Sequence, residues 1–245
     1  MILTTCAACA APLAHDAPRC VRCKTRYCNA TCQHDHWKTY VGRPETGGQV
    51  RQMAMNLLGA GLSEAYHFED ALTVLEAELA MKRRLGSSEQ NILVAQTNIA
   101  LCYYKLGRHQ EALDLRREIY ARGLALGVPS KDLFIDVLNL SWSMKECGLC
   151  AESKSFLREQ LPAARRALGA DHDTVIQLRW QHADALRLSD GASRDDVVEA
   201  VTLLEELSRT TQRIYGTSHP LANDIRNALG WARETLAAFD TSTSK

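Results

Sequence analysis

A dipeptide ending in glycine recurs along most of this 245-residue chain, and each copy closes an apolar, helix-favouring run. The four copies lie at intervals of 41, 42 and 47 residues: Leu85-Gly86, Leu126-Gly127, Leu168-Gly169 and Tyr215-Gly216. Self-similarity at a spacing of this size is typical of repeat architectures, in which each unit packs against its neighbours. This spacing constrains the fold more than any single motif does.

The stretches before these glycines carry apolar residues three and four positions apart, as amphipathic helices do. Small residues occupy one register, where two helices of a hairpin must approach closely: Ala71, Ala112, Ser153 and Ala200. Stretches of similar length lie between them, such as NILVAQTNIALCYYKLG and DLFIDVLNLSWSMKECG. The sequence therefore predicts an all-α chain of helical hairpins over residues 49–239. We expect a linker at 41–48, where proline and glycine oppose regular structure, and a disordered tail at 240–245.

The turn LGRHQEAL at 106–113 and the loop TSHPLAND at 217–224 resemble tetratricopeptide repeats of the kinesin-light-chain variety. The resemblance spans roughly residues 50–239. It implies a right-handed solenoid of about four hairpins and a terminal capping helix. It also implies a concave face, lined by the first helix of each hairpin, that binds peptides.

Asn98 and Asn139 stand 41 residues apart at one register of the predicted first helices. The family has a groove-facing asparagine at the matching position, so the resemblance implies that both residues contact a bound peptide. The alternatives are exposed polar side chains or hydrogen bonds to neighbouring helices. Lys105 and Arg179 are expected to add positive charge to the same groove.

Six of the nine cysteines lie near the start of the chain, with the spacings Cys6-x2-Cys9, Cys20-x2-Cys23 and Cys28-x3-Cys32. A CxxC turn directs two thiolates at one metal, and zinc takes four such ligands in a tetrahedron. The N-terminus lacks the positive region of a secretory signal, so the cysteines are expected to remain reduced. Their clustering then indicates metal binding, which would also supply the folding free energy of a segment poor in apolar residues.

The cysteine order, together with the pairs Tyr27-Cys28 and Cys32-Gln33 and with Trp37, resembles the MYND-type zinc finger and assigns it residues 1–40. The resemblance implies two interleaved Zn²⁺ sites and a shallow groove near Gln33 and Trp37 for proline-containing peptides. The first zinc would be held by Cys6, Cys9, Cys28 and Cys32, and the second site would begin with Cys20 and Cys23.

The last two ligands of that family, a histidine and a cysteine, are replaced here by Tyr40 and Pro44. The second site is therefore either vacant or completed by His15, His34 or His36. We predict one Zn²⁺ at the first site and an impaired second site.

Several classes of function are not expected. Basic and acidic residues number 29 each, so no net field favours nucleic acid or an anionic membrane, and no stretch reaches the roughly 20 apolar residues of a membrane span. The arginine doublets at 83–84, 116–117 and 165–166 share no register and are expected to form a solvated face. No nucleotide-binding or catalytic motif is present, so we expect neither an enzyme nor a small-molecule substrate.

Two functions remain. The first is a zinc-binding interaction scaffold that binds peptide segments of partner proteins through the repeat groove and through Gln33 and Trp37 of the finger. The alternative is a repeat-only cargo adaptor resembling a kinesin light chain, with a degenerate finger. Both imply an intracellular protein, cytoplasmic or nuclear, that is not secreted.

Overall fold

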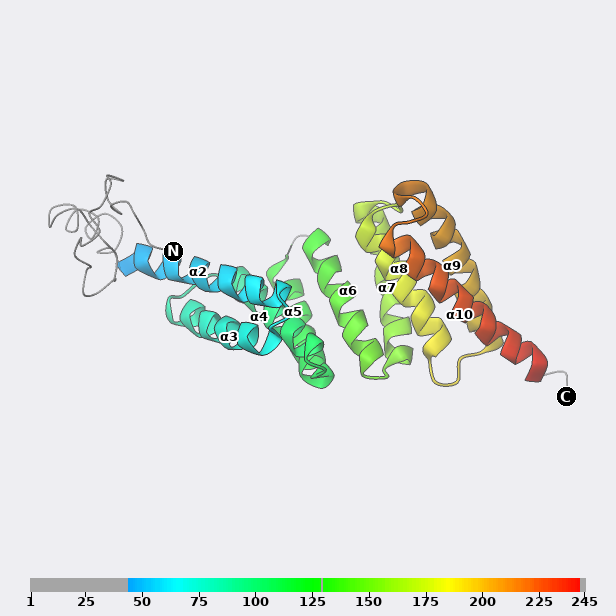
Figure 1. Ribbon diagram of the computed structural model, residues 1–245, viewed down its shortest axis with the longest axis horizontal. Helices are drawn as coiled ribbons and strands as arrows, with labels where there is room; N and C mark the ends of the chain where they lie inside the picture. The colour runs from blue at the N-terminus through cyan, green and yellow to red at the C-terminus, as the bar shows by residue number, and fades with distance from the viewer. Residues whose placement is uncertain (1–43, 129, 243–245) are drawn as a thin grey trace. The chain divides into compact units, whose positions relative to one another are not determined.

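The computed structural model describes residues 44–128 and 130–242, so every prediction made for residues 1–43 lies outside the described part of the chain. The described residues form helices joined by short turns, with no strand among them. Figure 1 shows their order along the chain. The helices are α2 (Pro44–Glu64), α3 (Phe68–Arg84), α4 (Glu89–Lys105), α5 (His109–Leu126), α6 (Ser130–Glu146), α7 (Cys150–Leu168), α8 (Asp173–Leu188), α9 (Arg194–Tyr215) and α10 (Pro220–Ser242).

The predicted fold class is confirmed. Helices pair as α2/α3, α4/α5, α6/α7 and α8/α9, and α10 follows as a single terminal helix. Three of the four glycine dipeptides end a helix at the expected place, at Leu126, Leu168 and Tyr215, and Leu85 caps α3 directly after its last residue. Gly127 shows why glycine is needed, because it caps α5 at φ 64° and ψ 37°, a left-handed conformation that other residues adopt at a cost.

Two predicted boundaries are wrong. α2 begins at Pro44, so residues 44–48 are helical rather than part of a linker. Proline fits the first position of a helix because its missing N–H would have no partner there, and the two glycines that follow weaken a helix without breaking it. α10 continues to Ser242, so residues 240–242 belong to a helix and not to a tail.

The chain divides after Ser87 into two compact units. In the first unit, α2 and α3 form a hairpin, and Gly59 of α2 lies at the contact between the two helices. A Cβ on Gly59 would lie 2.7 Å from Cδ2 of the buried Leu75, so only glycine fits without displacing that side chain. Oε1 of the buried Glu78 accepts a hydrogen bond from Asn56 of α2 (3.5 Å) and pairs with Lys82 of its own helix (3.0 Å), which partly compensates the burial of its charge inside the hairpin.

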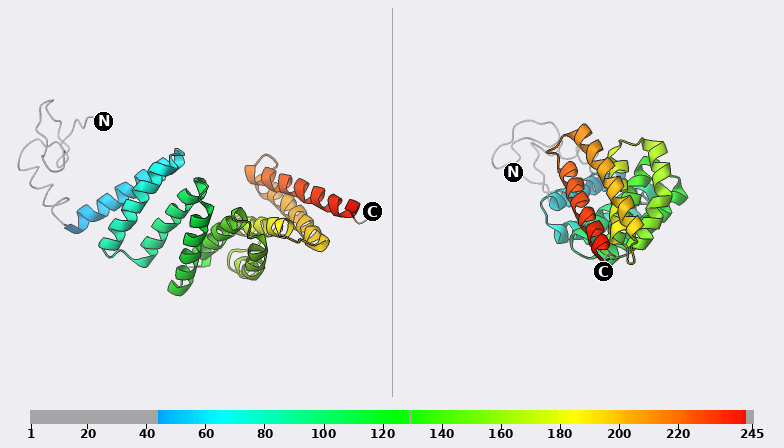
Figure 2. Two further views of the ribbon diagram at one scale, coloured as in Figure 1. Left: turned by 90° about the horizontal axis from the view of Figure 1, so that it is seen from below. Right: turned by 90° about the vertical axis from the view of Figure 1, so that its right-hand side faces the viewer.

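The second unit, α4 to α10, is a stack of hairpins in which each helix packs against the next. α6 also packs against α8, and α8 against α10 (Figures 1 and 2). Trp142 of α6 and Trp180 of α8 meet edge to face, with ring centroids 5.8 Å apart. The two rings therefore contribute to the packing of α6 against α8.

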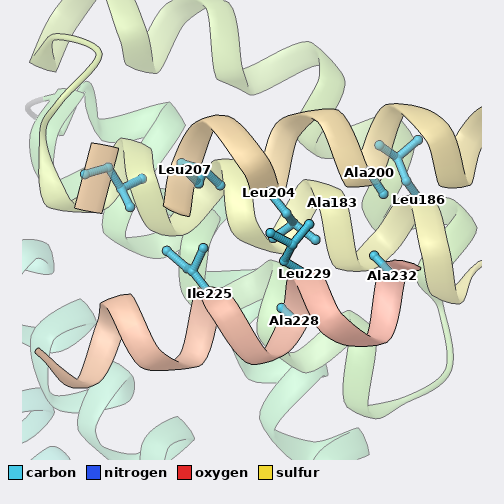
Figure 3. Close-up of a cluster of buried hydrophobic side chains, with 10 residues drawn as sticks. Ala183, Leu186, Ala200, Leu204, Leu207, Ile225, Ala228, Leu229 and Ala232 are labelled. Atoms are coloured by element: carbon cyan, nitrogen blue, oxygen red, sulfur yellow. The ribbon is translucent and has the colours of Figure 1, made fainter. Parts of the chain in front are cut away.

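The core of this stack is apolar and finely interdigitated. Figure 3 shows the cluster formed by α8, α9 and α10, in which alanines from each helix allow close approach and branched side chains fill the space between them. Leu204, Leu207 and Ile225 in this cluster are fully buried. Burying one such side chain stabilises the folded state by about 1.5–3 kcal/mol. The cluster therefore holds α8, α9 and α10 at fixed positions relative to one another. No described helix is long and apolar enough to cross a bilayer.

Candidate functional site

A pocket of about 480 Å³ opens between α4 and α6, the first helices of two successive hairpins. Ligand pockets in proteins commonly measure about 300–1,000 Å³. α4 contributes one wall, α6 the facing wall, and α5 and the turn after it the remainder. The lining residues are Gln90, Asn91, Leu93, Val94, Thr97, Asn98, Ile119, Val128, Asp132, Ile135 and Asp136.

The pocket exposes apolar surface on both walls. Val94 of α4 is 55% exposed and Ile135 of α6 is 47% exposed, whereas Leu93 and Ile119 below them are buried. Both exposed side chains face an open volume, so the pocket offers an apolar contact that the fold itself does not fill.

The α4 wall carries the uncharged polar groups of the site. Asn98 lies in this wall and is half-buried, with Thr97 beside it and Gln90 and Asn91 about two turns away. The Thr97 hydroxyl donates to the Leu93 carbonyl of its own helix, at 3.0 Å. The side-chain amide of Asn98 has both a donor and an acceptor, which is what an extended peptide backbone requires. Its peptide-binding role stays a prediction.

Asn139 occupies the matching position of α6 but lies outside this pocket. Its side chain is half-buried, and its backbone carbonyl accepts a 2.7 Å hydrogen bond from Arg116. The next matching position, 42 residues further along the chain on α8, is Gln181, which is 2% exposed. The matching side chain is therefore half-buried on α4 and α6 and buried on α8, and of the three residues Asn98 alone lines the pocket.

The α6 wall is acidic. Asp132 is exposed in the first turn of α6, and Asp136 lies one turn further on and is half-buried. Burial, and then the nearby Asp132 carboxylate, raise the pKa of Asp136 to about 6. Oδ2 of Asp136 would lie 3.8 Å from a Cβ placed on Gly123, so the carboxylate rests against the backbone of α5.

The expectation of a positively charged groove is wrong for this pocket. Arg179 donates to Glu206 at 2.6 Å, so its charge is neutralised at the α8–α9 contact. Lys105 is exposed at the end of α4, outside the pocket lining. The sequence signal for the acidic wall was the pair Asp132 and Asp136, which stand four residues apart and therefore on one face of the helix.

A buried arginine lies at the joint between α5 and α6. Nη1 of Arg116 donates to the Asn139 carbonyl and to Oγ of Ser143, both at 2.7 Å, and its guanidinium lies over the Tyr104 ring, 5.1 Å from the centroid. Burial lowers the pKa of Arg116 to about 10, so the group is charged at neutral pH. Arg116 is 7% exposed, and its assignment to a solvated face is wrong.

Among residues 44–128 and 130–242, no cluster of histidine, cysteine or carboxylate side chains could hold a metal ion. The predicted zinc ligands Cys6, Cys9, Cys20, Cys23, Cys28, Cys32, His34 and His36 lie outside the described residues, as do Gln33 and Trp37. Zinc binding and the finger groove therefore stay predictions.

Comparison with known proteins locates the fold. Two crystal structures of a protein of Podosopora anserina, described as a kinesin light chain with nearly identical TPR-like repeats, match with TM-scores of 0.63 and 0.62. Each is 19% identical and covers 79% of this chain and 90% of its own. The crystal structure of BtubC (BKLC) from P. vanneervenii matches with a TM-score of 0.50 and 12% identity, over 84% of this chain and 87% of its own.

These similarities show that the chain has a TPR-like repeat fold. No family model matches the chain, and no curated protein matches it.

Proposed function

We propose that this chain is an interaction scaffold that binds an extended peptide segment of a partner protein in the pocket between α4 and α6. The observation that carries this proposal is the open volume between two rigid first helices, into which Val94 and Ile135 expose apolar side chains. A peptide in this pocket would bury both side chains and gain roughly 25 cal/mol for each Å² of apolar surface removed from water.

The polar groups of the α4 wall suit the same ligand. A peptide main chain presents donors and acceptors at fixed intervals, and the half-buried Asn98 amide can serve one of each. Because α4 and α6 are each held by core contacts to α5, the pocket is preorganised and little ordering free energy is lost on binding. The TPR-like fold supports the proposal, since stacked hairpins present extended binding surfaces.

A charge placed on the apolar wall tests this function. We expect Val94→Glu to weaken binding of the peptides that the full-length protein selects from a displayed peptide library by at least about tenfold, because the carboxylate would have to be desolvated against the ligand. Val94 is exposed, so the substitution should leave folding intact. Fluorescence anisotropy of labelled peptides gives the affinities.

Val198→Glu is the matched control, since Val198 is partly exposed on α9, outside the pocket. It should keep the wild-type affinity. If Val94→Glu bound the selected peptides as tightly as Val198→Glu does, the α4–α6 pocket would not be the binding site.

We also propose that the N-terminal segment binds zinc, which the spacing of its six cysteines supports. Elemental analysis of the purified chain should find about one zinc per chain, lost in Cys28→Ser. Cys147→Ser is the control, because Cys147 is a free, half-buried cysteine near the start of α7, and it should retain the metal. Absence of zinc from the wild-type chain would favour the repeat-only adaptor, and two zincs per chain would contradict an impaired second site.

A further inference from the structure

We infer that the peptide bound between α4 and α6 carries a basic side chain, best an arginine, flanked by apolar residues, and that this side chain pairs with Asp132 and Asp136. The inference rests on the proposed function and names the chemistry of its ligand. Three features of the pocket lead to it, which are its charge, the placement of its carboxylates and the position of its apolar surface.

The charge of the pocket has one sign. Among the described residues that line the pocket, the only ionisable side chains are the two carboxylates of α6, since the residues contributed by α4 and α5 are apolar or neutral polar. On α5, the nearby cation Arg122 donates to Glu89 and Glu118, so its charge is engaged by other carboxylates. A ligand with a positive group therefore complements this site, and an acidic ligand is repelled.

The position of Asp136 is hard to explain by the fold alone. Asp132 lies in the first turn of α6, where the helix dipole stabilises a carboxylate. Asp136 lies one turn further along the helix, half-buried beside a like charge. Its desolvation is therefore not offset by the helix dipole. A cation entering the pocket would relieve both the desolvation and the repulsion. The free protein thus holds an unfavourable carboxylate that the ligand makes favourable.

The spacing of the two carboxylates favours a guanidinium. Side chains four residues apart on a helix are neighbours, roughly 5–6 Å apart at Cβ, so one planar group with five donors can reach both. An ammonium group is a compact, strongly hydrated charge and would serve them less well.

The apolar surface lies on both sides of the acidic pair. Ile135 is adjacent to Asp136 in sequence, and Val94 and Leu93 stand on the facing helix. In an extended segment, alternate side chains point to opposite sides. The residues next to the arginine would therefore face Val94 on α4, and those two positions away would face Ile135 on α6, while the arginine reaches the carboxylates.

Three labelled peptides that differ at one position test the inference with the full-length protein: SLVRVLS, SLVQVLS and SLVEVLS. We expect the arginine peptide to bind about tenfold or more tightly than the glutamine peptide, and the glutamate peptide to bind most weakly. Asp136→Asn should remove the preference for arginine. Asp114→Asn, the same charge change at an exposed position of α5 outside the pocket, should keep it.

A second measurement separates a ligand-binding role for Asp136 from a structural one. If Asp136 binds the ligand, Asp136→Asn should raise the thermal midpoint of unfolding of the free protein and weaken the binding of the arginine peptide. If Asp136 stabilises the fold, the midpoint should fall, and the inference is overturned. Equal or tighter binding of the glutamine or glutamate peptide, still lost in Val94→Glu, would overturn the inference and leave the proposed function standing. If none of the three peptides binds and the library selects no ligand, both fall.

Discussion

Arg116→Ala is expected to destabilise the protein by about 3 kcal/mol, because it removes a buried guanidinium, its two hydrogen bonds and its contact with Tyr104. Hydrogen bonds from a charged donor are worth about 1.5–3 kcal/mol, and truncation also leaves a cavity and an unsatisfied hydroxyl on Ser143, which is fully buried. The measurement is urea denaturation followed by far-ultraviolet circular dichroism.

The next residue in the chain supplies the control. Arg117 is 40% exposed at its side chain and donates to the exposed Glu152 at 2.9 Å, so Arg117→Ala should cost no more than about 1 kcal/mol. Arg116→Lys should give an intermediate loss, since it keeps the charge but lacks the planar fork. Equal costs for Arg116→Ala and Arg117→Ala would show that Arg116 does not hold α5 to α6.

The second large effect is a loss of stability in acid caused by His182. Burial, and then the positive charges of Arg158 and Lys154, lower the pKa of His182 to about 4. The folded state therefore binds fewer protons than the unfolded state between about pH 6.5 and pH 4. The stability that neutral His182 contributes is complete above pH 6.5 and is lost as the pH falls towards 4. It amounts to about 3 kcal/mol over that window.

Asp136 acts in the opposite direction, since its pKa is raised and its protonation on acidification favours the folded state. The effect of His182 is therefore measured as a difference. Stability of the wild type relative to His182→Gln should fall steadily from pH 7 to pH 4.5 in denaturation experiments. The exposed His67→Gln should track the wild type over that range. If the difference in unfolding free energy between the wild type and His182→Gln did not change with pH, His182 would not be a buried neutral histidine.

The repeat spacing was enough to predict the fold because its signals are local. Gly127 marks the end of α5 through its left-handed backbone, and small residues such as Ala112 and Ala200 mark the close contacts between helices and are fully buried. The errors lie at the ends of the solenoid. Pro44 and two glycines suggested a linker. Proline is, however, favourable at the first position of a helix, and the residues that follow the glycines continue α2 to Glu64.

The candidate site was predicted only in part. Asn98 was found from its register. Asn139 has the same register, but it lies beside Arg116 at the contact between α5 and α6 and does not line the pocket. The difference arises from the distance between successive first helices, which depends on packing across three helices and not on any local pattern. Asp132 and Asp136 carried a readable signal in their spacing. Whether two carboxylates on one helix face meet solvent or a pocket depends on the neighbouring helix.

Hydrogen exchange of the full-length protein, with and without a saturating selected peptide, tests most directly whether the peptide binds between α4 and α6. Bound peptide should slow the exchange of amides in α4 and α6, around Asn98 and Asp136, and leave α8 to α10 unchanged. Protection confined to α8–α10, or none in α4 and α6 while the peptide is bound, would contradict a peptide site between these helices.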